Sequence, residues 1–417
     1  MKRPTSSRVS AVNRRQFLRA GALGVGALLG GQVLESQAQE EVGKVVLPFE
    51  NGERPLVKYP QKRPLIRLTT RPPQLETPFS VYNEGVLTPN DAFFVRYHLT
   101  LSPPPNLDKE TFRVAIGGKV KAPLSLSVAD LKSKFEPVEV VAVNQCSGNS
   151  RGFFKPRVAG GQSGNGNMGN AKWKGARLKD VLEKAGIEAG VKQVVLDGLD
   201  RPILPQTPDF IKALNVDHAL DGEILLAYEM NGEDLPILNG FPLRVVVPGY
   251  YGTYWIKHVH DIKVVDDEFK GFWMATGYRI PAGDCAFIEP GTTPKKTEPI
   301  GRFNVRSFIT SLADGAQLKV RQAQTVRGIA FDGGHGIQQV LFSEDDGRTW
   351  REAQLGKDLG RYSFREWTIP FTPSRKGEYA LRVKATNRIG ESQPMEALWN
   401  PAGYMRNVVE TVKVTAA

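Results

Sequence analysis

Hydrophobic positions between residues 76 and 292 recur in short runs that turn-forming residues separate. Apolar stretches of strand length occur at 111–117, 138–143, 193–196, 243–247 and 256–265. Two stretches follow a helical period instead: 127–135 begins with a possible cap at Ser127, and 178–185 stops before Gly186. The mixture predicts an α+β domain over residues 76–292.

The pattern changes after about residue 300 to evenly spaced short strands. These are expected at 328–331, 338–343, 350–354, 365–371 and 379–385, and Asp345-Asp346-Gly347 predicts a hairpin turn. Strands at this spacing favour an immunoglobulin-like β-sandwich over residues 296–417, a module that commonly serves packing or dimerisation. Residues 39–75 are rich in Pro, Lys and Arg without a sustained period, so we expect an extended arm lying over the domain.

The first 38 residues have the features of an export signal. Six basic residues precede an apolar run that starts at Ala20 and is short for a membrane span, and Ser36-Gln37-Ala38 offers a cleavage site. Arg14-Arg15, followed by Phe17-Leu18, predicts the twin-arginine pathway to the periplasm. We therefore expect a mature protein without a membrane span. A retained N-terminal anchor is the alternative.

Composition excludes several classes of protein. With two cysteines among 417 residues, a disulfide framework, a Cys-rich zinc module and an iron–sulfur cluster are ruled out. There is no Cys-x-x-Cys-His motif, so we expect no covalent c-type haem in this chain. Removing residues 1–38 takes away six basic residues and one acidic residue, and the net charge falls from +11 to +6. That surplus is too mild to favour nucleic acid as a partner.

A glycine motif and a histidine pair resemble binding sites, but neither is expected to bind a dinucleotide or a metal. Gly164, Gly166 and Gly169 spell G-x-G-x-x-G, but no apolar strand precedes them and no apolar-faced helix follows, so a flexible loop at a pocket rim is expected. His258 and His260 share one face of a predicted strand. They have no third ligand nearby, and a metal site there is not expected.

Cys146 is the most informative single residue. It follows an apolar run and stands in the polar turn 144–151. A lone cysteine is usually an inert small hydrophobe, yet the Gly148-Asn149 turn can direct amides inward and Arg151 can favour a thiolate. Soft metals prefer thiolates. A single cysteine without a His/Cys cluster therefore suggests a metal whose other ligands come from a cofactor.

Four ordered motifs carry a resemblance to a known family. They lie at 93–98 (FFVRYH), 144–151 (NQCSGNSR), 226–232 (LAYEMNG) and 240–249 (GFPLRVVVPG). In sequence and spacing they resemble the sulfite oxidase family of molybdenum enzymes, and WNPAGY at 399–404 resembles the close of that family's dimerisation domain. Within the family the chain is most similar to bacterial periplasmic sulfite dehydrogenases without a haem domain.

The resemblance implies a role for particular residues. Cys146 would be the thiolate ligand of molybdenum, and Arg96, His98, Arg151 and Tyr278 would line a pocket for a small oxyanion. The pterin of molybdopterin would be held by Phe94, Val95, Arg96, Tyr97, His98, Cys146, Asp200, Asn239, Arg244, Trp255, Ile256 and Lys257. Arg244 and Lys257 suit its phosphate. Asn239 departs from the animal members, which have histidine there.

The implied activity is periplasmic oxidation of sulfite to sulfate, with single electrons passed to a c-type cytochrome. That cytochrome would be a separate acceptor or a haem subunit, in a homodimer or heterodimer. Three alternatives stay open: a sulfane dehydrogenase subunit of a thiosulfate-oxidising complex, a periplasmic methionine sulfoxide reductase, which would lack a C-terminal sandwich, and a non-catalytic exported binding module, which would lack the cysteine.

Overall fold

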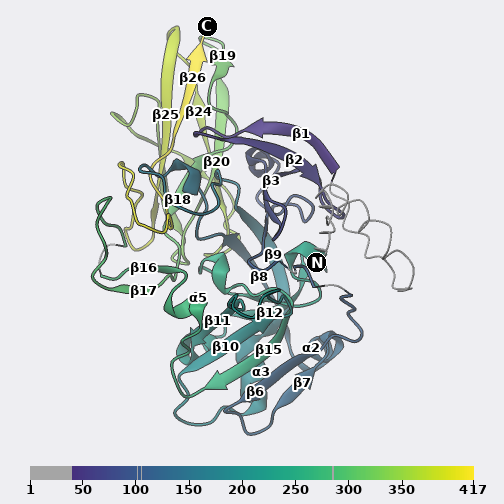
Figure 1. The fold of residues 1–417 in the computed structure, drawn as a ribbon. Helices are drawn as coiled ribbons and strands as arrows, with labels where there is room; N and C mark the ends of the chain where they lie inside the picture. Colours follow the sequence, from purple (N-terminus) through teal and green to yellow (C-terminus); the bar gives the residue numbers. More distant parts are fainter. Residues whose placement is uncertain (1–39, 101, 105, 284–285) are drawn as a thin grey trace, which may run out of the picture. The chain divides into compact units, whose positions relative to one another are not determined.

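Short strands are the main regular structure of the described residues, and the helices there are few and brief (Figure 1). The computed structural model describes residues 40–100, 102–104, 106–283 and 286–417. The predicted export signal and Cys285 lie outside these described residues. Within them, no helix combines the length and the apolar character needed to cross a membrane.

The expected extended arm is wrong, because most of residues 40–76 form a sheet. Its strands are β1 (Glu40–Val46), β2 (Glu53–Lys58), β3 (Leu65–Thr69), β4 (Gln74–Glu76) and β5 (Val95–Arg96), paired antiparallel in chain order. Val57, Leu65 and Leu75 are fully buried and form a small cluster with Tyr97 and Leu238. Short strands broken by prolines conceal the period of two, so the sequence alone does not reveal this sheet.

Two further sheets follow. One has the order β11-β10-β15-β6-β7; the other has the order β13-β12-β9-β8, with β14 paired to β12. The strands are β6 (Val114–Gly118), β7 (Leu124–Leu126), β8 (Pro137–Gln145), β9 (Met168–Arg177), β10 (Gln193–Gly198), β11 (Ile211–Asn215), β12 (Leu225–Met230), β13 (Glu233–Asp234), β14 (Arg244–Val246) and β15 (Val259–Val265). All five strands predicted for this region are present, with shifted ends. β15 and β6 run parallel, and the other pairs are antiparallel.

Both predicted helices are confirmed. In α2 (Val128–Lys134) the Ser127 hydroxyl accepts the amide of Asp130, whose carboxylate accepts the amide of Ser127, which is a capping box. α3 (Leu178–Ala185) ends at Gly186, whose φ of 71° suits glycine. Both helices contact β9, and α2 also contacts β7 while α3 contacts β6. The other helices are the short α4 (Val216–Ala219), α5 (Phe272–Ala275) and the 3-10 turns η1 (Phe79–Asn83), η2 (Arg151–Phe153), η3 (Ile237–Asn239) and η4 (Gly252–Tyr254).

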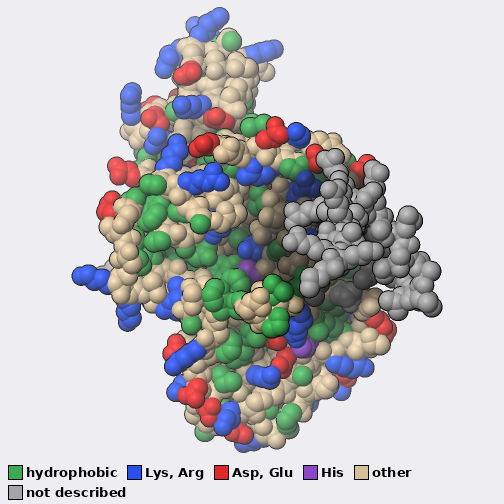
Figure 2. Space-filling view, viewed as in Figure 1, with side chains coloured by type: hydrophobic (Ala, Val, Ile, Leu, Met, Phe, Trp, Pro, Cys, Tyr) green, Lys and Arg blue, Asp and Glu red, His purple; other side chains and the backbone are tan. Residues whose placement is uncertain are grey.

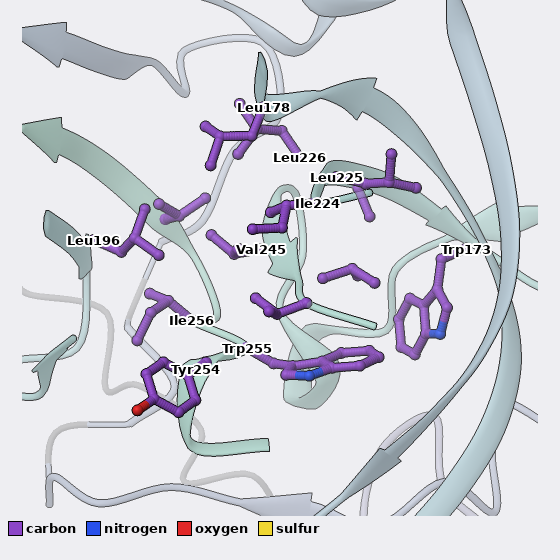
Figure 3. Packing of buried hydrophobic residues seen from close by; sticks show 14 of the residues in the cluster. Trp173, Leu178, Leu196, Ile224, Leu225, Leu226, Val245, Tyr254, Trp255 and Ile256 are labelled. Atoms are coloured by element: carbon purple, nitrogen blue, oxygen red, sulfur yellow. The ribbon is translucent and has the colours of Figure 1, made fainter. Parts of the chain in front are cut away.

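The main core lies between these sheets and helices. Figure 3 shows Trp173 of β9, Leu178 of α3, Leu226 of β12 and Val245 of β14 gathered with Trp255. The two tryptophan rings meet edge to face with centroids 5.5 Å apart. Segment 252–257 lies beside the end of β8, since a Cβ on Gly252 would lie 2.5 Å from Asn144 Oδ1, and Cys146 follows directly after that strand.

The C-terminal region contains two sheets around one hydrophobic cluster, plus the hairpin β16 (Arg279–Pro281) and β17 (Thr297–Pro299) before it. The sheet orders are β18-β20-β24-β23 and β19-β26-β25-β21-β22. The strands are β18 (Arg306–Ile309), β19 (Ala316–Leu318), β20 (Gln324–Phe331), β21 (Ile337–Ser343), β22 (Arg351–Glu352), β23 (Gln354–Leu355), β24 (Arg365–Phe371), β25 (Gly377–Asn387) and β26 (Thr411–Ala416). The turn at Asp346 and Gly347, both with positive φ, joins β21 to β22 as predicted. The immunoglobulin-like topology stays a prediction.

Candidate active site

One cavity brings together residues from many segments of the chain. Most of the residues predicted for the site line it, namely Phe94, Arg96, His98, Cys146, Asp200, Asn239, Arg244, Trp255, Ile256, Lys257 and Tyr278. Val95, Tyr97 and Arg151 are not among the lining residues. Figure 2 shows a recess near the middle of the drawn face, where basic and histidine side chains lie behind a rim of apolar ones.

Cys146 directly follows β8 and is half-buried on the cavity wall. Its amide donates to the carbonyl of Asn167 at 2.9 Å. The amide of Asn149 donates back to the Cys146 carbonyl at 3.0 Å, so it closes the turn and does not point into the cavity as expected. Across the described residues, no group of three or more His, Cys, Asp or Glu side chains suits a metal ion. A metal here would take one thiolate from the chain and its other ligands from a cofactor.

Two buried basic side chains, Arg244 and Lys257, line the same cavity as Cys146. The Arg244 guanidinium donates to the carbonyls of Asn239 and Trp255 at 2.8 and 3.2 Å, and Lys257 Nζ donates to the Arg96 carbonyl at 2.7 Å. Burial lowers the pKa of Arg244 to about 9. Burial, with repulsion from Arg244, lowers the pKa of Lys257 to about 7. An anion in the cavity would raise both pKa values, because it would offset the desolvation.

The cavity walls are strongly cationic. Asp200 supplies the one carboxylate among the lining residues that the structure describes, against Arg96, Arg244 and Lys257. Burial raises the pKa of Asp200, and the nearby Lys257 acts against that rise. The arrangement therefore favours an anionic ligand.

Tyr278 and His98 form a hydrogen-bonded pair between the Tyr278 hydroxyl and His98 Nε2. The imidazole stacks on Phe210 with centroids 3.6 Å apart. Burial, with repulsion from Arg96, holds the pKa of His98 well below its usual range, so this ring is neutral at pH 7. Burial raises the pKa of the Tyr278 phenol, which stays protonated. Tyr278 adopts a φ of 57°, an uncommon conformation that directs this side chain to the cavity.

The ring of Tyr404 lies between Arg151 and the cavity-lining Tyr278. Its Nε donates to the carbonyl of Ala402 at 3.2 Å, and its guanidinium lies 5.1 Å from the ring centroid of Tyr404. Tyr404 in turn stacks on Tyr278, with centroids 5.4 Å apart and planes 10° from parallel. Tyr404 ends the WNPAGY motif but was not predicted to neighbour the site.

Val95 and Tyr97 belong to the core beneath the site. Val95 is 1% exposed in the small N-terminal cluster. The Tyr97 hydroxyl hydrogen-bonds with Nε2 of His258 at 2.7 Å, and Nδ1 of His258 lies 2.6 Å from the carbonyl oxygen of Phe241. Both nitrogens of His258 are thus engaged. Tyr97 also lies beneath Lys257, whose Nζ is 4.2 Å from its ring centroid.

Asn239 is anchored by protein groups. Its Oδ1 accepts from Lys62 Nζ at 2.5 Å, and its Nδ2 donates to the carbonyl of Phe94 at 3.0 Å. Lys62 is buried at 3% exposure, and burial lowers its pKa to about 7. No local pattern in the sequence marks Lys62, because 177 residues separate it from Asn239.

Several buried polar atoms of the cavity-lining residues have no hydrogen-bond partner. They are Asn144 Oδ1, Ser147 Oγ, Thr253 Oγ1 and Arg244 Nε. Buried polar groups are ordinarily hydrogen-bonded, so this set fits a ligand rich in donors and acceptors, such as a pterin with a phosphate. Three of these residues were not predicted for the site. Asn144 and Ser147 lie within the quoted cysteine motif, whereas nothing local marks Thr253.

The buried Lys212 leads to a prediction about pH and stability. Its Nζ donates to the Trp273 carbonyl at 2.6 Å, and burial lowers its pKa to about 7. Between pH 7 and about 10 the unfolded chain therefore binds more protons at this lysine than the folded chain, and folding gains stability as pH rises. Lys212→Met should flatten the rise in melting temperature from pH 7 to 9 in the cofactor-free protein. The exposed Lys184→Met is the control, and equal slopes for all three proteins would contradict the assignment.

Two family models match most of the chain. The oxidoreductase molybdopterin binding domain matches residues 101–273, and the Mo-co oxidoreductase dimerisation domain matches residues 297–417. Mitochondrial sulfite oxidase of Mus musculus is 33% identical over 405 residues, which are 92% of this chain and 72% of that protein. Sulfite oxidase of Arabidopsis thaliana is 30% identical over 86% of this chain and 96% of its own length. The solved structure of the sulfane dehydrogenase SoxCD from Paracoccus pantotrophus has a similar fold, with a TM-score of 0.70, 22% identity and coverage of 89% of this chain and 87% of that one.

Proposed function

Because the chain belongs to the sulfite oxidase family of molybdopterin enzymes, we propose that it oxidises sulfite to sulfate and passes the electrons singly to a c-type cytochrome. One observation carries the proposal. The thiol of Cys146 and the guanidinium of Arg96 belong to the same cationic cavity, so a metal centre and a small oxyanion would meet there.

The residues present fit molybdopterin. Cys146 would be the thiolate ligand of the metal, and Arg244 and Lys257 would bind the phosphate. The unpartnered oxygens of Asn144 and Thr253 would accept hydrogen bonds from the pterin. When bound, this cofactor supplies two-electron redox chemistry and oxygen-atom transfer.

The side chains around the substrate position would bind and orient the anion. Arg96 would neutralise sulfite and fix its orientation with charge-assisted hydrogen bonds. The protonated Tyr278 hydroxyl would donate to a substrate oxygen, and the neutral His98 would hold that hydroxyl in place. Arg151, which Tyr404 separates from Tyr278, would raise the positive electrostatic potential at the substrate position without contacting the substrate.

The deciding experiment combines metal and pterin analysis with an assay on the same preparation. We expect about one molybdenum per mature chain and reduction of cytochrome c that depends on added sulfite. Molybdenum without sulfite-dependent reduction, but with oxidation of protein-bound sulfane sulfur, would favour the sulfane dehydrogenase alternative. Absence of both metal and pterin would favour the binding-module alternative.

Location and assembly are part of the same proposal. The predicted twin-arginine signal would deliver the folded protein to the periplasm, where c-type cytochromes would be available as partners. The match of residues 297–417 to a dimerisation domain supports assembly through that region, with itself or with a haem subunit. Sedimentation of the purified mature chain alone and with the cytochrome would separate these two arrangements.

Arg96→Gln is expected to raise the KM for sulfite at least about tenfold, because one charge-assisted hydrogen bond is worth roughly 1.5–3 kcal/mol. Arg151→Gln was expected from the sequence to act in the same way, but its place behind Tyr404 predicts a smaller rise. Steady-state kinetics at several ionic strengths test both variants. The exposed Arg113→Gln is the control, and an unchanged KM in Arg96→Gln would place the substrate elsewhere.

A further inference from the structure

Glu76, the last residue of β4, carries a buried carboxyl group that the proposed chemistry does not use. Its side chain belongs to a residue only 2% exposed. Oε2 accepts the amide of Gly164 at 2.9 Å, and Oε1 accepts the amide of Gly166 at 2.8 Å. Burial raises the pKa of Glu76 to about 7, and the two amide donors act against that rise. The carboxyl group is therefore tied to backbone 88 and 90 residues away.

This contact explains the glycine motif. A Cβ on Gly164 would lie 2.8 Å from Glu76 Oε1, and a Cβ on Gly166 would lie 2.0 Å from the carbonyl oxygen of Thr77. Glycine is needed at Gly166, where the contact is with backbone, whereas a side chain at Gly164 would displace the Glu76 carboxyl group. The expected place at a pocket rim is wrong, because none of residues 163–167 lines the cavity. Residues 163–167, here called the glycine loop, are held against the N-terminal sheet.

The glycine loop in turn supports residues 146–152, here called the cysteine loop. The carbonyl of Gly164 accepts the amide of Ser150 at 2.7 Å, and the carbonyl of Asn167 accepts the amide of Cys146 at 2.9 Å. The Ser163 hydroxyl donates to the carbonyl of Gly148 at 2.9 Å. Glu76 thus touches neither Cys146 nor the cavity, but two successive layers of hydrogen bonds link its carboxyl group to the cysteine backbone.

We propose that Glu76 is a positioning residue for Cys146, holding the thiol at the cavity wall through the glycine loop. A carboxyl group at this place can accept both amides at once. A glutamine can accept only one, because its Nε2 is a donor and would face the second amide. Only the role of Cys146 as a metal ligand rests on the proposed function. The positioning of the thiol does not.

The test measures the mobility of the thiol in the full mature chain. With Cys285→Ser as the parent, Cys146 is the single thiol, and its alkylation by iodoacetamide reports access and motion in protein made without cofactor. We expect Glu76→Gln to raise the alkylation rate at least about threefold. In protein made with cofactor, the same variant should lose molybdenum faster on dialysis. Glu76→Asp keeps two acceptors on a shorter side chain, so it should fall between the parent and Glu76→Gln.

Asp332→Asn is a matched control. Asp332 is also buried, at 1% exposure, and its carboxylate accepts the amides of Gly334 and Gly336 in a turn of the C-terminal region. The Asp332→Asn substitution should lower the melting temperature and leave the alkylation rate and the metal retention at parent values. If Glu76→Gln matches the parent in both readouts, or if Asp332→Asn changes them equally, the proposal is wrong.

Hydrogen–deuterium exchange on the unmutated chain tests the proposal even if a Glu76 variant does not fold. The amides of Gly164 and Gly166 should exchange as slowly as that of Cys146, because they are part of the same support. Much faster exchange at Gly164 and Gly166 than at Cys146 would contradict the proposal. A chain that never binds molybdopterin would overturn the proposed function, whereas the alkylation and exchange results would stand, because they use cofactor-free protein.

Discussion

Cys146→Ser is expected to lower molybdenum-dependent sulfite oxidation at least about a hundredfold while the fold is retained. A hydroxyl is a poor ligand for a soft metal, and loss of groups that merely orient metal ligands already costs about 10–100-fold. The stability should change little. The Cys146 side chain is only half-buried, and the hydrogen bonds that fix its place are made by its backbone amide and carbonyl.

The measurement combines turnover, molybdenum per chain and thermal melting of the same samples. Cys285→Ser, which removes the other thiol, is the control and should keep its activity. Turnover near the parent value in purified Cys146→Ser would exclude this cysteine as the metal ligand. A loss of activity that comes with a large fall in melting temperature would point to misfolding.

Tyr278→Phe is expected to lower kcat/KM for sulfite about ten- to a hundredfold, roughly 1.4–2.7 kcal/mol, with molybdenum content unchanged. The variant removes only the hydroxyl that meets His98. The ring contacts with Tyr404, and with Lys212 Nζ at 5.4 Å from the ring centroid, would remain. The expected loss therefore reports the hydroxyl and not the packing of the ring.

Tyr278→Ala separates catalysis from packing. It removes a ring from a residue that is 7% exposed and should cost about 3–5 kcal/mol of stability in addition to the activity. Tyr228→Phe removes a phenol hydroxyl from a buried residue of β12 that does not line the cavity, and is expected to leave the kinetics unchanged. If Tyr278→Phe has parent kinetics, Tyr278 is a packing aromatic.

Local elements were largely predictable from the sequence. The stop of α3 at Gly186 and the capping box of α2 depend on residues within one or two turns, and both were confirmed. The strand predicted at 365–371 matches β24 (Arg365–Phe371), whose alternating burial is visible in its own residues. The four family motifs, each a contiguous segment, carried the resemblance to the sulfite oxidase family, which the comparisons confirmed.

The N-terminal sheet and the surroundings of the site were decided by tertiary structure. Residues 40–76 contain too few alternating positions per strand to indicate a sheet, and burial of Leu75 against Leu238 depends on a distant segment. The candidate residues quoted from separate motifs do meet at one cavity, with Arg151, Val95 and Tyr97 behind its wall.

What the sequence by itself determined was the set of short-range elements and the chemical identity of the candidate ligands, because caps, turns and apolar periods involve neighbouring residues. The tertiary structure alone decided which charges are buried. Lys62, Lys212 and Glu76 resemble ordinary surface residues in the sequence, and each acquires a shifted pKa only because distant segments remove it from water. The support of Cys146 by Glu76 has the same origin, since it runs through hydrogen bonds between residues some 90 positions apart.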